Sequence, residues 1–109
     1  MKEENQMFSF DETKSINPNY IRIASDFLKE CQNLHIPMPI VTHLYDGFRF
    51  SFCNKDGKEI GDGIIHSGSY YNHSEIETMG MPWDNGDVST HTPYVLARLI
   101  YLFYSEDDA

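Results

Sequence analysis

Residues 40–53 read IVTHLYDGFRFSFC, which is two short runs of β-branched and aromatic residues on either side of an Asp46-Gly47 pair. An Asp-Gly pair between two such runs is a strong signal for a β-hairpin, because a type I′ turn needs positive φ at both central positions. The three phenylalanines of the second run alternate, so they share one face of that strand. We therefore predict an antiparallel hairpin whose phenylalanine face lies in the core.

A helix is predicted before this hairpin and another near the end of the chain. Asn17-Pro18 supplies an N-cap and a proline at the first helical position, and apolar residues then recur at three- and four-residue steps until Pro37. Thr92-Pro93 supplies the same kind of start for the last helix. The apolar stripe comprises Tyr20, Ile23, Ala24, Phe27, Leu28, Cys31 and Leu34 in the first helix, and Leu96, Leu99, Ile100 and Phe103 in the last.

The sheet is predicted to continue beyond the hairpin. Residues 59–66 contain three isoleucines and form a third strand, and residues 74–79 are the candidate fourth strand with Ile76 inward. Residues 80–87 combine Gly, Pro, Asn and Asp, which is typical of a loop. The predicted fold class is α+β, with an N-terminal helix, a three- to four-stranded antiparallel sheet and a C-terminal helix.

The chain has 109 residues, which is the size of one domain. We expect residues 1–16 to form a partly ordered N-terminal arm, residues 17–104 a single α+β domain, and residues 105–109 an acidic tail. No apolar run approaches the ~18 residues of a membrane span, and the N-terminus is not a signal peptide. A cytoplasmic location is therefore expected, with both cysteines as free thiols.

The charge is strongly acidic: 8 Lys and Arg against 17 Asp and Glu give a net charge of −9. Direct binding to nucleic acid or to an anionic membrane is disfavoured, because neutralising phosphates requires a basic patch. The segment between Lys58 and Arg98 contains no basic residue. Its acidic residues either serve solubility or form an acidic face for a basic protein partner. These residues are Glu59, Asp62, Glu75, Glu77, Asp84 and Asp87.

No spacing in the sequence indicates an enzyme, a metal centre or a cofactor site. The histidines form no His-x-x-x-His pair, and His66, His73 and His91 would meet at a metal only if the fold brought them together. Cys53 is the candidate nucleophile, with His43 or His66 as its base. We therefore predict no catalytic residue, no metal and no cofactor, and a small enzyme using Cys53 with a nearby histidine is the alternative.

An interaction surface is the functional feature that the sequence favours. Glu75 and Glu77, two residues apart on a strand, would lie about 6.6 Å apart on one side, loosely the spacing of successive phosphates. Tyrosine and tryptophan are enriched at binding hot spots. Trp83 either anchors a partner or closes the sheet against the last helix. The candidate partner-binding residues are Tyr70, Tyr71, Glu75, Glu77, Trp83, Asp84 and Asp87.

In its overall character, a short, acidic, aromatic-rich α+β chain resembles the small accessory proteins of phages and prophages, anti-CRISPR inhibitors among them. The resemblance implies a non-enzymatic inhibitor in the cytoplasm of a bacterial host. Such an inhibitor binds a nucleic-acid-binding effector and competes with nucleic acid for its basic groove. A structural or assembly component that self-associates is a further alternative, and the oligomeric state is left open.

Overall fold

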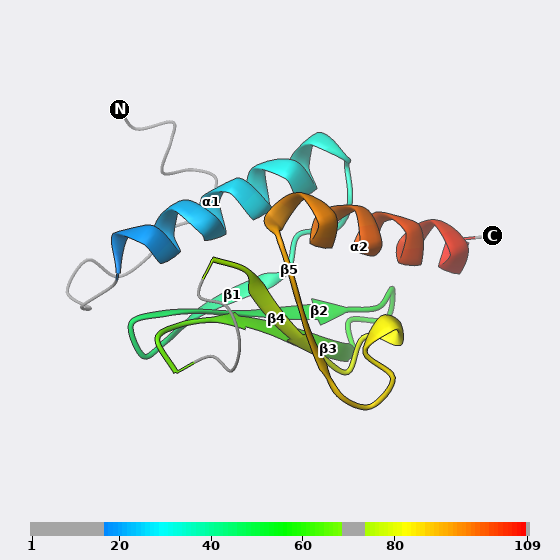
Figure 1. The fold of residues 1–109 in the computed structure, drawn as a ribbon. Coiled ribbons are helices and arrows are strands. Elements are labelled where there is room, and N and C mark those ends of the chain that lie inside the picture. Colours follow the sequence, from blue (N-terminus) through cyan, green and yellow to red (C-terminus); the bar gives the residue numbers. More distant parts are fainter. Residues whose placement is uncertain (1–16, 69–73, 109) are drawn as a thin grey trace.

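Two helices lie over one face of a five-stranded antiparallel sheet in the computed structural model, which describes residues 17–68 and 74–108 (Figure 1). The α+β class and the two flanking helices are confirmed, but the sheet has five strands rather than three or four. The elements are α1 (Pro18–Asn33), β1 (Ile40–Leu44), β2 (Gly47–Cys53), β3 (Glu59–Ile65), β4 (Ile76–Met79), the 3-10 helix η2 (Pro82–Asp84), β5 (Val88–His91) and α2 (Pro93–Asp108).

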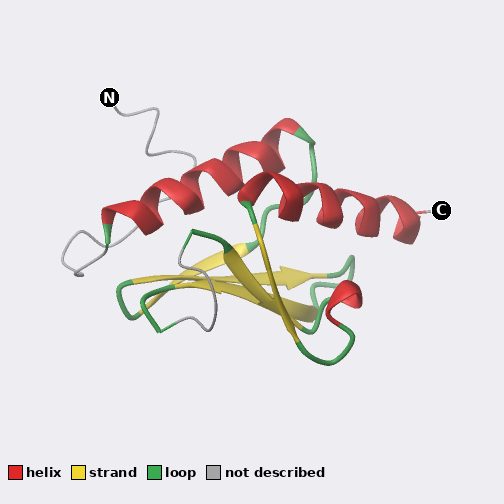
Figure 2. Cartoon of the chain, in the orientation of Figure 1, coloured by secondary structure: helices red, strands yellow, loops and turns green. Residues whose placement is uncertain are grey.

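The strands are ordered β1-β2-β3-β4-β5, so each strand pairs with its neighbours in the chain. Figure 2 shows the helices as one layer and the sheet as the other. The unforeseen strand, β5, pairs with β4 through Ile76↔His91 and Met79↔Val88. It has only four residues, one of them aliphatic, so it lacks the apolar alternation that marks a strand in sequence.

The hairpin of β1 and β2 is present, but its turn is shifted by one residue from the prediction. Leu44 pairs with Gly47, so the two turn residues are Tyr45 and Asp46, and of these only Tyr45 has a positive φ, of 55°. Gly47 lies inside β2, where an added Cβ would sit 1.8 Å from the carbonyl oxygen of Ile65. The glycine is therefore required by the close approach of β3 rather than by the turn.

α1 begins as predicted: the side chain of Asn17 accepts a hydrogen bond from the Asn19 amide at 2.9 Å, and Pro18 opens the helix. It ends at Asn33, and His35 follows in the left-handed region with φ of 58°. The helix thus stops before Pro37 is reached. Its predicted stripe is buried from Tyr20 to Cys31, and Leu34 is half-buried.

The core lies between the helices and the phenylalanine face of β2. Phe27 of α1 packs edge-on against Phe50 and Phe52, with ring centroids 5.2 and 6.1 Å apart. Cys31 is fully buried, and desolvation raises the pKa of its thiol to about 12, so it is a core residue as the sequence indicated. α2 completes the core with Leu96, Ala97 and Ile100.

The predicted N-terminal arm and acidic tail are compared with the structure at the two ends of the chain. The arm, residues 1–16, lies outside the described residues, as do Tyr70 and Tyr71. α2 continues to Asp108, so residues 105–108 of the predicted acidic tail belong to this helix. Within the described part of the chain, neither helix is long and apolar enough to cross a membrane.

Candidate binding site between η2 and α2

The carboxylate of Asp84 fixes the loop that contains η2. Asp84 is only 4% exposed. This carboxylate accepts hydrogen bonds from the Met81 amide at 3.1 Å, from Thr78 Oγ1 at 2.9 Å and from Ser89 Oγ. A buried carboxylate is tolerated when it is hydrogen-bonded in this way. The structure therefore places Asp84 inside the loop as its internal anchor, where it presents no carboxylate to a partner.

Trp83 is held against the body of the protein and is half-buried. Its indole Nε1 donates a hydrogen bond to Thr78 Oγ1 at 3.2 Å, and its ring meets that of His91 edge-on at 6.0 Å. Its ring also packs against the core. The side chain thus closes the sheet near α2, as one sequence interpretation held, and it also lines an open groove. Its role as an anchor for a partner stays a prediction.

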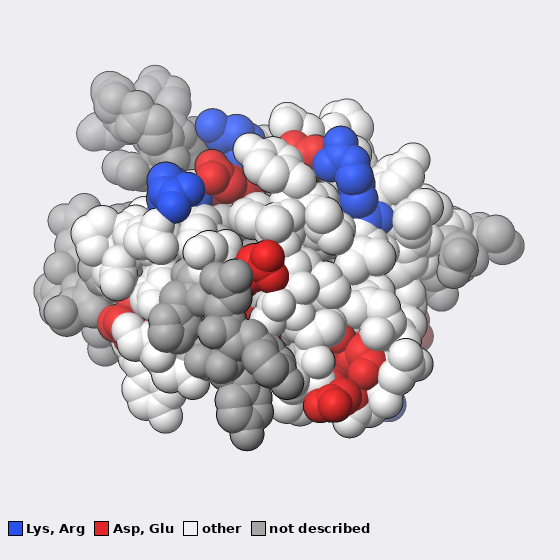
Figure 3. All heavy atoms as spheres, viewed as in Figure 1, with Lys and Arg blue, Asp and Glu red and all other residues white. Residues whose placement is uncertain are grey.

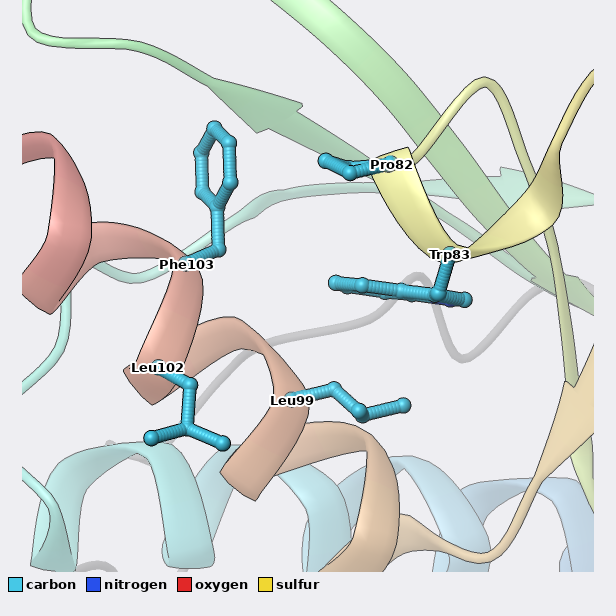
Figure 4. Close-up of a pocket in the computed structure, with 5 residues that line it drawn as sticks. All are labelled: Pro82, Trp83, Leu99, Leu102 and Phe103. Carbon is cyan, nitrogen blue, oxygen red and sulfur yellow. The ribbon is translucent and has the colours of Figure 1, made fainter.

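An apolar groove of about 280 Å³ lies between η2 and α2 and is open to solvent (Figure 4). Pro82 and Trp83 line it from η2, and Leu99, Leu102 and Phe103 line it from α2. The sequence placed Leu99 and Phe103 on the buried stripe of the last helix. In the structure both are half-buried and face this groove rather than the centre of the core.

The outer face of α2 is apolar as well, and sequence reasoning missed it. Tyr94, Val95, Tyr101 and Leu102 are all at least two-fifths exposed. They form two pairs of residues spaced seven apart, which places each pair on one face of a helix. A signal was present, because residues 93–105 contain only one charged residue, Arg98, and a helix that is apolar all round is normally buried.

The acidic segment is not an unbroken negative surface. Arg49 of β2 reaches across β3, where its Nη2 lies 2.8 Å from Glu59 Oε2 and its Nε lies 2.9 Å from Asp62 Oδ2. A hydrogen bond from Ser51, and then the charge of Arg49, hold the pKa of Glu59 below its usual value. Two of the six carboxylates are therefore neutralised by a residue outside the segment.

The remaining predicted carboxylates are not equivalent either. Glu77 is only 7% exposed on β4, whereas Glu75 precedes that strand and is half-buried. The expected exposed pair, Glu75 and Glu77, is therefore not formed. Asp87 is exposed and accepts a hydrogen bond from the Val88 amide at 2.8 Å. In Figure 3 most of the face is uncharged, and Lys and Arg side chains gather mainly over the helices.

The placement of Cys53 does not favour the enzyme alternative. Cys53 ends β2 opposite Glu59, whereas His43 pairs with Phe48 near the start of that strand. Five residues of strand separate the two levels, or roughly 16 Å. His66 follows Ile65, which also pairs with Phe48, so it lies at the same far end.

The side chains of a serine, a histidine and an aspartate also meet near β5, but not in the order of a catalytic triad. They are Asp84, Ser89 and His91. Ser89 Oγ donates to Asp84 and lies 2.7 Å from His91 Nε2, so the serine stands between the other two. In a catalytic triad the histidine occupies the middle position. Burial lowers the pKa of His91, which the charges of Asp84 and Glu75 oppose. In the described ranges no three metal-ligating side chains converge, and His73 lies outside them.

Comparison of the chain with protein-family models, with curated proteins and with solved structures gave no match. Its function is therefore inferred from its own described residues. These combine a fixed tryptophan, an open apolar groove and a helix with an uncovered apolar face. Such an arrangement is suited to contact with another macromolecule.

Proposed function

We propose that this protein is a non-enzymatic protein-binding module that engages a basic, nucleic-acid-binding partner and competes with nucleic acid for it, as phage-type inhibitors do. The observation that supports this most directly is the exposed apolar face of α2 beside the Trp83 groove. Soluble monomers rarely leave a contiguous apolar patch in water unless it serves contact. α2 exposes four large apolar side chains on one side, around Arg98, which is paired with Glu30.

Charge and apolar area have separate roles in this proposal. A net charge of −9 attracts a basic partner from a distance and raises the association rate. Exposed ion pairs contribute only ~0–1 kcal/mol each, whereas one hot-spot side chain contributes about 2 kcal/mol or more. The apolar surface of α2 therefore sets the dissociation rate, and the acidic charge sets the association rate.

The proposal is tested by capturing the partner from a bacterial lysate and measuring its binding kinetics below and above ~0.1 M salt, where the Debye length is about 10 Å. We expect a basic partner, a lower association rate at high salt, and displacement of the protein by the partner's nucleic acid. The charge variant is Asp87→Lys, because Asp87 is exposed and Glu77 is buried. Binding that ignores both salt and nucleic acid would contradict competition.

Self-association is the competing proposal, because the same exposed face of α2 is able to meet a second copy. The charge of −9 on each copy opposes this, and the opposition weakens as salt is added. Sedimentation velocity at low and high salt separates the two. A monomer under both conditions supports a foreign partner, and a dimer that persists at low salt supports self-association.

A further inference from the structure

We infer that the groove between η2 and α2 receives one bulky apolar side chain from a partner segment that carries Lys or Arg on either side of it. This inference rests on the proposed function and specifies the chemistry of the partner. Three features of the described residues support it. They are the size and lining of the groove, the fixed position of Trp83, and the negative charge that follows each of its two walls along the chain.

The groove is of side-chain size and mainly apolar in its lining. Its volume of about 280 Å³ falls below the ~300–1,000 Å³ of pockets that enclose drug-sized molecules. All five lining residues are apolar or aromatic, and the groove is open along one side. A leucine, methionine or phenylalanine side chain from a passing segment fits these conditions, because its backbone remains outside.

One wall of the groove is already in place before any partner arrives. Thr78 and His91 contact the indole of Trp83 from behind, as described above. Asn85 directly after η2 takes the left-handed conformation with φ of 53°, and Asp84 holds the loop from within. Because Trp83 does not need to be ordered on binding, contact with it costs little conformational entropy.

Negative charge follows each of the two elements that line the groove along the chain. Asp87 is exposed in the loop that follows η2. On the other wall, α2 continues past Phe103 to a C-terminal end at Asp108, and its last turn contains no basic residue. The C-terminal end of a helix carries partial negative charge from its backbone carbonyl groups, which favours a cation nearby.

The only basic residue of α2 does not supply that cation. Arg98 Nη1 lies 2.9 Å from Glu30 Oε2 of α1 and also bonds to the Tyr94 carbonyl oxygen, at 3.5 Å. Arg98 is thus engaged over the neighbouring helix. A Lys or Arg from the partner segment would complement the negative C-terminal end of α2 while an adjacent apolar side chain filled the groove.

Trp83 is the only tryptophan of the chain, so its fluorescence reports on the groove directly. The probe is a synthetic peptide with Leu-Phe at its centre and two lysines on each side, titrated into the whole protein at low salt. One control peptide has Glu in place of every Lys, and another has Ser-Ser in place of Leu-Phe. We expect a saturable shift of Trp83 emission, with an apparent Kd at least about tenfold lower than for either control.

Two matched variants locate the binding. Leu102→Ser removes a groove-lining side chain that is 56% exposed, and Ile40→Ser removes a 59% exposed side chain of β1 that does not line the groove. We expect Leu102→Ser to weaken binding of the lysine peptide at least about tenfold and Ile40→Ser to leave it unchanged. Circular dichroism checks that both variants keep the native fold.

The outcomes separate this inference from the function on which it rests. Equal responses to the lysine and glutamate peptides, or equal binding by the Leu102→Ser variant, overturn the groove assignment. If a captured basic partner then still binds in a salt-dependent way, the proposed function stands while the groove inference fails. If neither a basic partner nor the lysine peptide binds, both fail.

Discussion

α1 and α2 are each 16 residues long, begin with proline, and lie side by side over the same face of the sheet. α1 exposes no large apolar side chain anywhere along its described length. α2 buries Leu96, Ala97 and Ile100 and also exposes apolar residues on its outer side. The difference shows that α1 is accounted for by folding alone, whereas α2 has a second apolar face that folding does not use.

The largest expected effect separates the two helices by stability. Phe27→Ala in α1 should lower the free energy of unfolding by about 3–5 kcal/mol, because it empties a fully buried site against Phe50 and Phe52. Tyr101→Ser on the outer side of α2 should change it by no more than about 0.5 kcal/mol. Urea denaturation measures both. If Tyr101→Ser lowered the free energy of unfolding as much as Phe27→Ala does, the distinction between the two helices would be wrong.

A smaller effect is expected where the sheet supports the groove. Thr78→Val keeps the side-chain shape but removes a buried hydroxyl that binds both Asp84 and Trp83, and should cost about 1–3 kcal/mol. The emission of Trp83 should shift with it, because the indole loses its hydrogen-bond acceptor. Thr90→Val on β5 is the control, since Thr90 pairs with Glu77 on the opposite face of the sheet. Equal effects of the two substitutions would mean that Thr78 does not position Trp83.

The smallest effect concerns pH and the N-terminal end of α1. The carbonyl oxygen of Asp46 accepts a hydrogen bond from the Asn17 amide, and hydrogen bonds from Ser67 hold the pKa of the Asp46 carboxyl below its usual value. A lowered pKa in the folded state gives stability that is present above the unfolded pKa and lost as the pH falls through the folded one. Because Asp46 is largely solvated, the loss of stability at low pH should be small.

Asp46→Asn tests this dependence. Thermal unfolding is measured from about pH 6 down to about pH 2. The unfolding temperature of the native chain should fall slightly more steeply with decreasing pH than that of the variant. Acid should therefore loosen the contact between the β1–β2 turn and Ser67, which follows β3, rather than the groove at α2. Identical pH profiles for the two proteins would remove Asp46 as the cause.

Local patterns in the sequence were sufficient for much of the fold. Asn17-Pro18 and Thr92-Pro93 marked the helix starts, and the alternating phenylalanines marked the inner face of β2. The turn was misplaced by one residue because Gly47 is required by its close contact with β3 and not by the turn. This contact comes from a strand later in the chain, so the local sequence does not reveal it. β5 was missed because pairing with β4, rather than its own composition, makes it a strand.

The candidate site was less predictable, because carboxylate burial depends on distant partners. Asp84 is internal because Thr78, Met81 and Ser89 donate to it, and nothing in its own loop sequence indicates those bonds. Arg49 neutralises Glu59 from another strand. The sequence left Trp83 open between a partner anchor and a residue that closes the sheet, and the groove could not be foreseen without knowing where α2 passes.

The strand order has a consequence for how the chain folds. Since every strand pairs with its neighbour in sequence, each hairpin is able to form as soon as its two strands have been synthesised. The core still lacks Leu96, Ala97 and Ile100 until α2 arrives. Among the described elements α2 is thus made last, closes the core, and lines the groove together with η2. A chain without α2 would leave its core open on that side and would lack the groove, so the core and the groove are completed in the same step.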